Sequence, residues 1–406
     1  MLQRILDAAG VGVRTCAGLM AINPDVFAAW AAGQESIPES LQPVLAAALS
    51  VSPTMLSETA KSGRRWSEAD ITPQIWFKFK GPGLTESDRE FVLLIRMMGH
   101  YLNELEEVTR QKSIQWKSIF ESIRNTVDIQ APVKEQGKAA ARLFRQATAL
   151  GHGATGSGEV LRGLLRATGI LAVEIPAPES VLEGCSFYVG SANSPRPCVF
   201  ANSHHTTWFR RNAILMHEVG HAIFEPFTGA TLDLINAPQG EDIEIRAQSF
   251  AQEALIPREV ILHAAQSIGC KWNALNADSL ANLVATTHVE LRTLLSAAHE
   301  EGFLGEAQLE ELKRIDISNA LRGLSDHALS TEEYLEKRGA EERDWVGKRT
   351  TTLTARPIRL PIGYVNAIVD AYRNRQISPS KAAAYTMVDE TDFLDRFGDI
   401  YEEANV

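Results

Sequence analysis

Two histidines and a glutamate form the most reactive combination of residues in the chain. His217 and His221 are four residues apart, and Glu218 directly follows the first histidine. In a helix this spacing places both imidazoles on one face, one turn apart, where they can hold a single zinc ion. Glu218 can then take a proton from a zinc-bound water, as in the H-E-x-x-H motif. The alternative interpretation is a core helix with two hydrogen-bonded histidines.

The residues around this motif must form a buried helix if the histidines are to be held in place. Six flanking residues are apolar, as such a helix requires: Ile214, Leu215, Val219, Ala222, Ile223 and Phe224.

A catalytic zinc site needs a third protein ligand and one open position for water. Residues 241–257 follow closely and show apolar residues at helical spacing, with Pro257 ending the helix. Glu244 can point at the metal, and Glu241 is the less favoured alternative because it lies nearer the helix start. Gln248, one turn after Glu244, can hydrogen-bond a ligand from outside. The core positions expected in this helix are Ile245, Phe250, Ala251 and Leu255.

The two segments together resemble the ImmA/IrrE metallopeptidases, whose pattern is HExGH followed by E-x-x-A-N-x-F-A-x-x-L-L-x-P. This chain has His-Glu-Val-Gly-His and then Glu-Ile-Arg-Ala-Gln-Ser-Phe-Ala, with Gln248 where Asn or Asp is usual. The resemblance extends to residues 184–203 and to Phe209-Arg-Arg-Asn. It implies a protein substrate, typically a helix-turn-helix repressor or an antitoxin. Prophage induction, stress responses to DNA damage and anti-phage defence are the settings it suggests.

Other polar residues near the motif are candidates for helping the chemistry. His204, His205 and Tyr188 could stabilise the oxyanion of the transition state, although a solvated loop histidine is the commoner case. A thiolate from Cys185 or Cys198 could occupy the open zinc position and silence the enzyme. Small buried core residues are the favoured interpretation of both cysteines.

Length and composition restrict the class of protein. A chain of 406 residues predicts two to four domains, and no apolar run approaches membrane-spanning length. The four cysteines lack pair spacing, which indicates reduced thiols and a cytoplasmic location. A net charge of −11 argues against a protein that coats nucleic acid.

The expected fold is α+β and mostly helical, with a gluzincin-like peptidase unit that contains a small antiparallel sheet. We divide the chain into four parts: a helix-turn-helix-like domain at 1–60, a helical connector at 61–130, the zinc peptidase domain at 131–305, and a helical region at 306–406. The last part carries no recognisable chemistry and could sense a signal or bind a partner.

The first part resembles the helix-turn-helix domains of phage repressors around residues 22–34, where Asn23 would cap the third helix. Its charge does not favour DNA. Residues 1–60 contain two basic and five acidic residues, a net charge of about −3, whereas a DNA-binding domain needs a cationic face. The outward positions of the third helix would be Asp25, Ala28 and Ala29, none of which reads base edges well.

The sequence therefore predicts a cytoplasmic zinc (Zn²⁺) endopeptidase with His217, His221 and Glu244 as ligands and Glu218 as the base. Two rival hypotheses remain. One is a DNA-binding transcriptional regulator whose zinc fold is structural or sensory. The other is an interaction scaffold, which would bind no metal.

Overall fold

The computed structural model describes residues 1–20, 22–49, 51–57, 76–78, 85–110, 114–148, 150, 158–175, 177, 180, 182–191, 194–202, 208–225, 241–324, 344–347 and 358–398. Helices dominate these residues, and the strands form one four-stranded and one two-stranded sheet. The expected α+β, mostly helical class is confirmed. His204 and His205 lie outside the described residues.

The larger sheet has the strand order β1-β3-β4-β2. Its strands are β1 (Trp76–Lys78), β2 (Leu171–Ile175), β3 (Gly184–Ser191) and β4 (Ser194–Asn202). β3 pairs antiparallel with β1 and with β4, as expected. β2 instead pairs parallel with β4, with Leu171 opposite Cys198 and Ile175 opposite Asn202. The sheet is therefore mixed, because β2 joins at the far edge of β4 rather than beside its neighbour in sequence.

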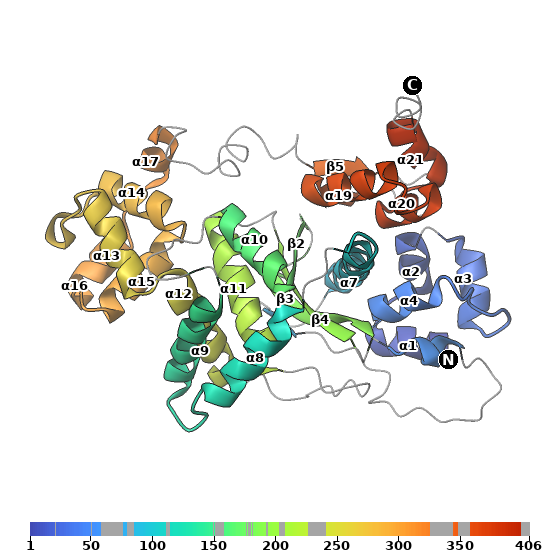
Figure 1. The fold of residues 1–406 in the computed structure, drawn as a ribbon, viewed down its shortest axis with the longest axis horizontal. Coiled ribbons are helices and arrows are strands. Elements are labelled where there is room, and N and C mark those ends of the chain that lie inside the picture. Colours follow the sequence, from blue (N-terminus) through green and yellow to red (C-terminus); the bar gives the residue numbers. More distant parts are fainter. Residues whose placement is uncertain are drawn as a thin grey trace.

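One hydrophobic core lies on the face of the sheet that α7 (Glu86–Val108) covers (Figure 1). Gly99 permits this packing, because a Cβ there would lie 3.1 Å from Val189 and 3.2 Å from Cys198 Sγ. Thr85 and Asp88 form a capping box at the start of α7. Helices from both ends of the chain share this core: α1 (Leu2–Ala9), α2 (Val13–Leu19), α3 (Pro24–Ala31), α4 (Gln42–Leu49), α5 (Pro53–Ser57), α19 (Ile362–Arg373), α20 (Pro379–Tyr385) and α21 (Glu390–Phe397).

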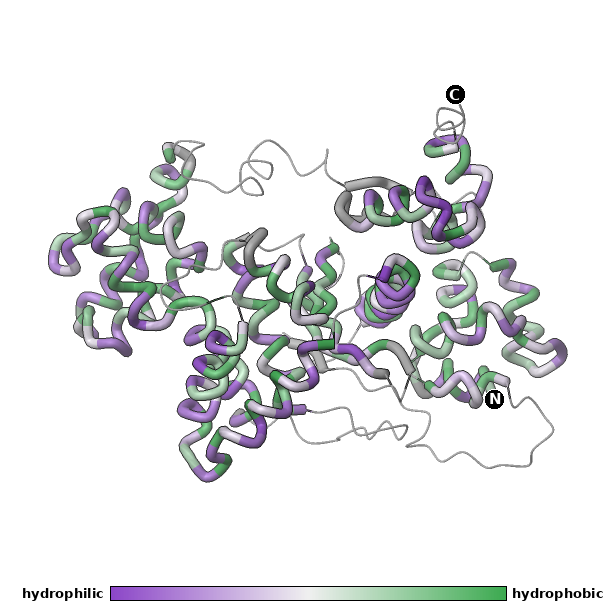
Figure 2. The backbone as a smooth tube through the Cα atoms, viewed as in Figure 1, coloured by the Kyte–Doolittle hydropathy of each residue, from purple (hydrophilic) through white to green (hydrophobic). Residues whose placement is uncertain are grey.

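The N-terminal and C-terminal helices are both tied to α7 by polar contacts. Arg96 donates to the carbonyl oxygen of Ala47 at 2.9 Å, and the Tyr385 hydroxyl lies 3.0 Å from Glu104 Oε2. Figure 2 shows hydrophobic and hydrophilic residues alternating along the helices, as amphipathic helices require. Segments that are more than 300 residues apart in the sequence, at Ala47 and Tyr385, thus contact the same helix.

The second core lies on the opposite face of the sheet and contains the H-E-x-x-H helix. Its helices are α8 (Gln115–Thr126), α9 (Val133–Ala147), α10 (Gly158–Thr168), α11 (Trp208–Phe224), α12 (Glu241–Leu255), α13 (Arg258–Ser267), α14 (Ala277–Thr287), α15 (Leu291–Glu300), α16 (Glu306–Leu312) and α17 (Ser318–Gly323). A 3-10 turn at Trp272–Ala274 precedes α14. His288 adopts a left-handed conformation with φ of 56° and ends α14, so α14 and α15 are separate helices.

The N-terminal helices follow the sequence pattern closely. Asn23 caps α3 by accepting from the Asp25 amide at 2.8 Å, and Phe27 and Trp30 are buried. Asp25 and Ala28 are exposed on α3, as are Arg4 and Arg14 elsewhere. These findings describe a helical domain, and its assignment to the helix-turn-helix class remains a prediction.

The last described part of the chain begins with a hairpin-like pair of strands, β5 (Asp344–Gly347) and β6 (Ile358–Pro361), which run antiparallel. Within the described parts of the chain, no helix is both long and apolar enough to cross a membrane. The proposed division into four parts is a prediction that these contacts do not test.

Candidate metal centre

The two motif histidines point their Nε2 atoms at one common position. His217 and His221 lie on α11, are 2% and 3% exposed, and have Nε2 atoms 3.0 Å apart. Glu244 from α12 completes the group, with Oε2 3.2 Å from His217 Nε2 and Oε1 3.5 Å from His221 Nε2. Glu244 is partly exposed, so the triad is reached from solvent on the side of its carboxylate.

The spacing of these atoms fits a tetrahedral metal. Zinc–nitrogen and zinc–oxygen bonds of about 2.0–2.1 Å place neighbouring ligand atoms roughly 3.3 Å apart in a tetrahedron. The three ligand pairs measure 3.0, 3.2 and 3.5 Å, which bracket that value. Two imidazoles and one carboxylate are also a ligand set that zinc prefers, and they leave a fourth position open. The residues therefore fit a catalytic zinc ion.

Two glycines let α12 approach closely enough for Glu244 to reach the histidines. A Cβ on Gly220, inside the motif, would lie 3.1 Å from the Ala247 Cα and 3.2 Å from the Phe250 ring. On the other side of α12, a Cβ on Gly137 of α9 would lie 2.3 Å from the Arg246 carbonyl oxygen. α12 is thus packed between α9 and α11, and this packing fixes the position of the third ligand.

Glu218 is fully buried beside the first residue of β3, an inner strand of the sheet. A Cβ on Gly184, the first residue of β3, would lie 2.9 Å from Glu218 Oε1 and 2.4 Å from Ile214. Only glycine leaves room for the carboxylate at this point of the strand. Because β1 pairs with β3 here, with Lys78 opposite Gly184, Glu218 lies next to an antiparallel pair of strands.

The electrostatics of the triad favour an ionised carboxylate. Hydrogen bonds from His217 and His221 lower the pKa of Glu244 well below its usual range. Burial acts to lower the pKa of His221, but Glu244, Glu218 and Glu225 together raise it above the ordinary value. Three acidic groups around two imidazoles make this a site that attracts a cation.

The first turn of α11 is fixed by a set of charged and polar contacts. Arg210 donates to Glu183 at 2.8 Å and to Glu290 at 3.1 Å. Arg211 lies 3.0 Å from Glu174 of β2, and the same carboxylate is paired with Arg162. These contacts tie the metal helix to the sheet and to α15. The Phe-Arg-Arg-Asn segment that opens the helix therefore has a positioning role.

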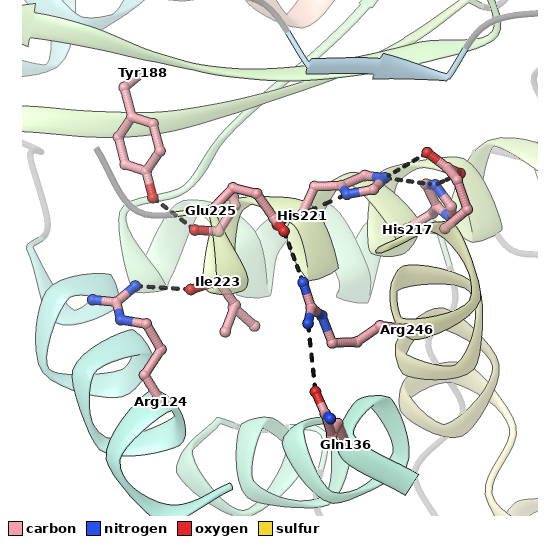
Figure 3. Close-up of polar contacts among 10 residues, drawn as sticks. Arg124, Gln136, Tyr188, His217, His221, Ile223, Glu225 and Arg246 are labelled. Atoms are coloured by element: carbon pink, nitrogen blue, oxygen red, sulfur yellow. Dashed lines mark hydrogen bonds and ion pairs between the residues drawn. The ribbon is translucent and has the colours of Figure 1, made fainter. Parts of the chain in front are cut away.

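A carboxylate behind His221 was not among the residues selected from the sequence. Glu225 Oε2 lies 3.9 Å from His221 Nδ1, and Glu225 Oε1 accepts from Arg246 at 2.8 Å (Figure 3). Arg246 also reaches Gln136 Oε1 at 3.4 Å. Burial raises the pKa of Glu225 despite these partners. The one signal in the sequence was the four-residue spacing from His221 to Glu225.

Among the described side chains, the sequence candidates Gln248 and Tyr188 do not join the triad. Gln248 is exposed on α12, and among the described residues no hydrogen bond joins it to a triad side chain. The Tyr188 hydroxyl donates to the Ala222 carbonyl at 2.7 Å, near the end of α11 away from His217 (Figure 3). Glu241 is the first residue of α12, and the cluster contains Glu244 instead. Ile245, expected in the core, is 39% exposed.

Cys185 and Cys198 are fully buried in the sheet. Side chains alternate between the faces of a strand, so Cys185 faces away from Glu218, whose neighbour on β3 is Gly184. Burial raises the pKa of Cys198 to about 12 and that of Cys185 well above its usual value. Both are neutral thiols against α7, as the favoured interpretation expects.

Comparison with known proteins agrees with this geometry. Residues 166–282 match the Peptidase_M78 family model, described as the IrrE N-terminal-like domain. The matched segment runs from α10 to α14 and contains all three triad residues and Glu218. The match supports the ImmA/IrrE resemblance and a metallopeptidase-like function for this part of the chain. No curated protein and no solved structure matches the chain.

Proposed function

We propose that this protein is a zinc-dependent endopeptidase that cleaves a regulatory protein in the cytoplasm. The observation that carries the proposal is the convergence of His217, His221 and Glu244 at 3.0–3.5 Å, beside the buried Glu218. The family match over residues 166–282 supports the same class of activity. His217, His221 and Glu244 would hold the zinc ion.

Each residue of the site has a defined task in peptide hydrolysis. A zinc ion held by the triad would supply Lewis acidity, which makes water more acidic and polarises the peptide carbonyl. Glu218 accepts a proton from the attacking water and delivers it to the leaving amine, so that one carboxyl serves as base and then as acid. Its buried carboxylate beside Gly184 is held in place rather than solvated. The exposed side of Glu244 is the side from which a substrate reaches the triad.

The substrate class rests on the resemblance to ImmA/IrrE proteins. It implies a helix-turn-helix repressor or an antitoxin, cut to release transcription during a stress, prophage or anti-phage response. An extended segment of such a protein can add to a sheet edge through its backbone. At Gly184, the residue nearest the base, β3 is paired with both β1 and β4, so such a segment would have to join the edge strand β1.

The test of this function is replacement of Glu218 by Gln. The variant should retain zinc at one ion per chain but lose cleavage of the repressor encoded beside this gene. Loss of one acid–base group typically lowers kcat by about 10²- to 10⁴-fold. The matched control is Glu253→Gln, a buried carboxylate on α12 that pairs with Arg142 and should leave cleavage unchanged. Equal cleavage by the Glu218 variant and the control would remove the mechanism.

A DNA-binding regulator is the second candidate function. What favours it is the N-terminal set of helices, in which α3 has the capped start expected of a repressor helix. The exposed Asp25 and Ala28 on α3 do not favour it. Affinity for the protein's own promoter that falls steeply with salt would support this function. Absence of such binding, together with proteolysis, would leave the peptidase as the whole function.

A further inference from the structure

His221 has two ring nitrogens, and each faces a carboxylate. Nε2 faces the triad at 3.5 Å from Glu244 Oε1, whereas Nδ1 faces Glu225 Oε2 at 3.9 Å. A neutral imidazole carries its proton on only one nitrogen. A negative charge beside Nδ1 favours the proton there, which leaves the lone pair of Nε2 for a metal.

Glu225 is itself held in a fixed position. Its side chain is 8% exposed, and Arg246 donates to its Oε1 at 2.8 Å. The Arg246 guanidinium lies 4.3 Å from the centre of the Phe224 ring and reaches Gln136 of α9. Arg246 is therefore bound on three sides. A buried carboxylate paired in this way has little freedom to turn away from the imidazole.

Arg246, which holds Glu225, and Glu244, the third residue of the triad, both belong to α12. Glu244 and Arg246 are two residues apart on α12, and the Gly137 contact fixes α12 at the Arg246 carbonyl. Any shift of α12 would thus move the third ligand and the support of His221 together. This arrangement joins α9, α11 and α12 into one scaffold for the metal ligands.

We propose that Glu225, held by Arg246, is a positioning residue that fixes the orientation and tautomer of His221 for metal binding. The inference rests on the proposed function, because it assumes that the triad holds zinc. It goes beyond that function by assigning the pair a role in metal affinity. The role is electrostatic and geometric, and Glu225 touches neither the substrate nor the reacting atoms.

The experiment measures the zinc dissociation constant of the full chain by competition with a chromophoric chelator. Glu225→Gln keeps the shape of the side chain and removes its charge. The variant should bind zinc about 10- to 100-fold more weakly, the usual effect of removing such a partner. Arg246→Met should weaken binding in the same direction, and Arg246→Lys should restore most of it. The double variant should lose less than the sum of the two single changes, because both act through one interaction.

Two controls separate positioning from general stability. Glu253→Gln removes a comparably buried carboxylate from α12, where Glu253 pairs with Arg142 at 2.7 Å. This control should change zinc affinity by less than about twofold. The visible spectrum of the cobalt-loaded protein provides a second readout: it should change in Glu225→Gln and stay constant in Glu253→Gln, since only the former alters a ligand.

The possible outcomes distinguish failure of the positioning role of Glu225 from failure of the proposed zinc peptidase function. If the wild-type chain binds no zinc, the proposed function fails first. If the wild type binds zinc tightly and both Glu225→Gln and Arg246→Met bind it equally well, the positioning role is wrong while the peptidase proposal stands. Should Glu225→Gln fail to fold, the comparison of Arg246→Met with Arg246→Lys decides the question.

Discussion

The helices that carry the candidate metal ligands and the N-terminal helices differ in the side chains that they bury. Helices α11 and α12 bury histidines, carboxylates and an amide beneath apolar neighbours, whereas the buried side chains of α1–α5 are apolar. Within the described residues, the buried polar and charged side chains all follow residue 85. Burial of a charge costs free energy unless it is paired, so such residues are retained where they position or perform chemistry. The candidate triad and Glu218 lie in the part of the chain that buries polar groups, and α1–α5 do not.

The buried side chains of the N-terminal region are apolar and share one core with α7 and with the C-terminal helices. Ile5, Phe27 and Leu49 are fully buried there, while the exposed positions of α3 carry an acid and an alanine. The helix-turn-helix assignment of this region remains a prediction, and the acidic and alanine side chains on α3 do not favour contact with DNA.

The largest expected effect comes from removing a ligand. His221→Ala should abolish stoichiometric zinc binding and cleavage, because two remaining ligands cannot hold the ion in a tetrahedral site. The α1–α5 region should be unaffected, since it packs in the other core. Metal analysis and hydrogen exchange of α1–α5 would measure both expectations. Retention of one zinc per chain would place the metal elsewhere.

The next largest effect is expected from a substitution in the N-terminal core, which should lower stability without changing zinc affinity. Phe27 is fully buried and packs against Trp30 with ring centres 5.7 Å apart. Phe27→Ala should destabilise this region by about 3–5 kcal/mol, as is typical for a buried phenylalanine. Zinc affinity should remain within about twofold of the wild type. A large loss of zinc would show that the two regions are energetically coupled.

One part of the candidate site could be selected from the sequence because that part is local. His217, Glu218 and His221 belong to one helix, so their spacing alone places them on one face. Glu244 could be selected because the following helix has a recognisable end at Pro257. Glu225 was missed because its role depends on Arg246, a residue of another helix, and no periodicity reports such a pairing. Gln248 was selected from its spacing but is exposed.

The features of the fold that differ from the sequence predictions also depend on contacts between residues that are distant in the sequence. The parallel pairing of β2 with β4 depends on strand order, which local propensities do not determine. The buried stripe of α12 passes through Ala247, Phe250 and Ala254, which leaves Ile245 outside it. Helix α14 ends at His288 in a left-handed conformation, which sequence favours only for glycine and asparagine. The local elements were predictable, and their packing was not.

A smaller effect tests the close approach of α9 to α12. Gly137→Ala would place a Cβ 2.3 Å from the Arg246 carbonyl oxygen, so one helix must shift. We expect destabilisation of about 1–3 kcal/mol and weaker zinc binding, because Glu244 and Arg246 would move together. Gly163→Ala on α10 is the matched control, since nothing lies within 4 Å of a Cβ there. That control should be neutral or stabilising by up to about 1 kcal/mol.

The smallest effect concerns the pH dependence of stability, and it tests whether charge fixes the metal helix. Burial acts to raise the pKa of Glu174, but Arg162 and Arg211 outweigh it and lower the pKa below its usual value of 4.5. A carboxyl with a lowered pKa in the folded state contributes stability above its unfolded pKa, and this contribution is lost as the pH falls through the folded pKa.

Glu174→Gln should therefore be less stable than the wild type at neutral pH, with a difference that narrows below about pH 4.5. Urea unfolding of both chains across this range measures the narrowing. Glu310→Gln is the control, because Glu310 is an exposed partner of Lys313 and such pairs contribute little at any pH. A constant difference between wild type and Glu174→Gln would mean that shape, and not the ionised pair, anchors α11 to β2. In that case the charged pairs around Glu174 would not stabilise the position of α11. The functional difference between α11 and the apolar N-terminal core would then be limited to His217, His221 and Glu244.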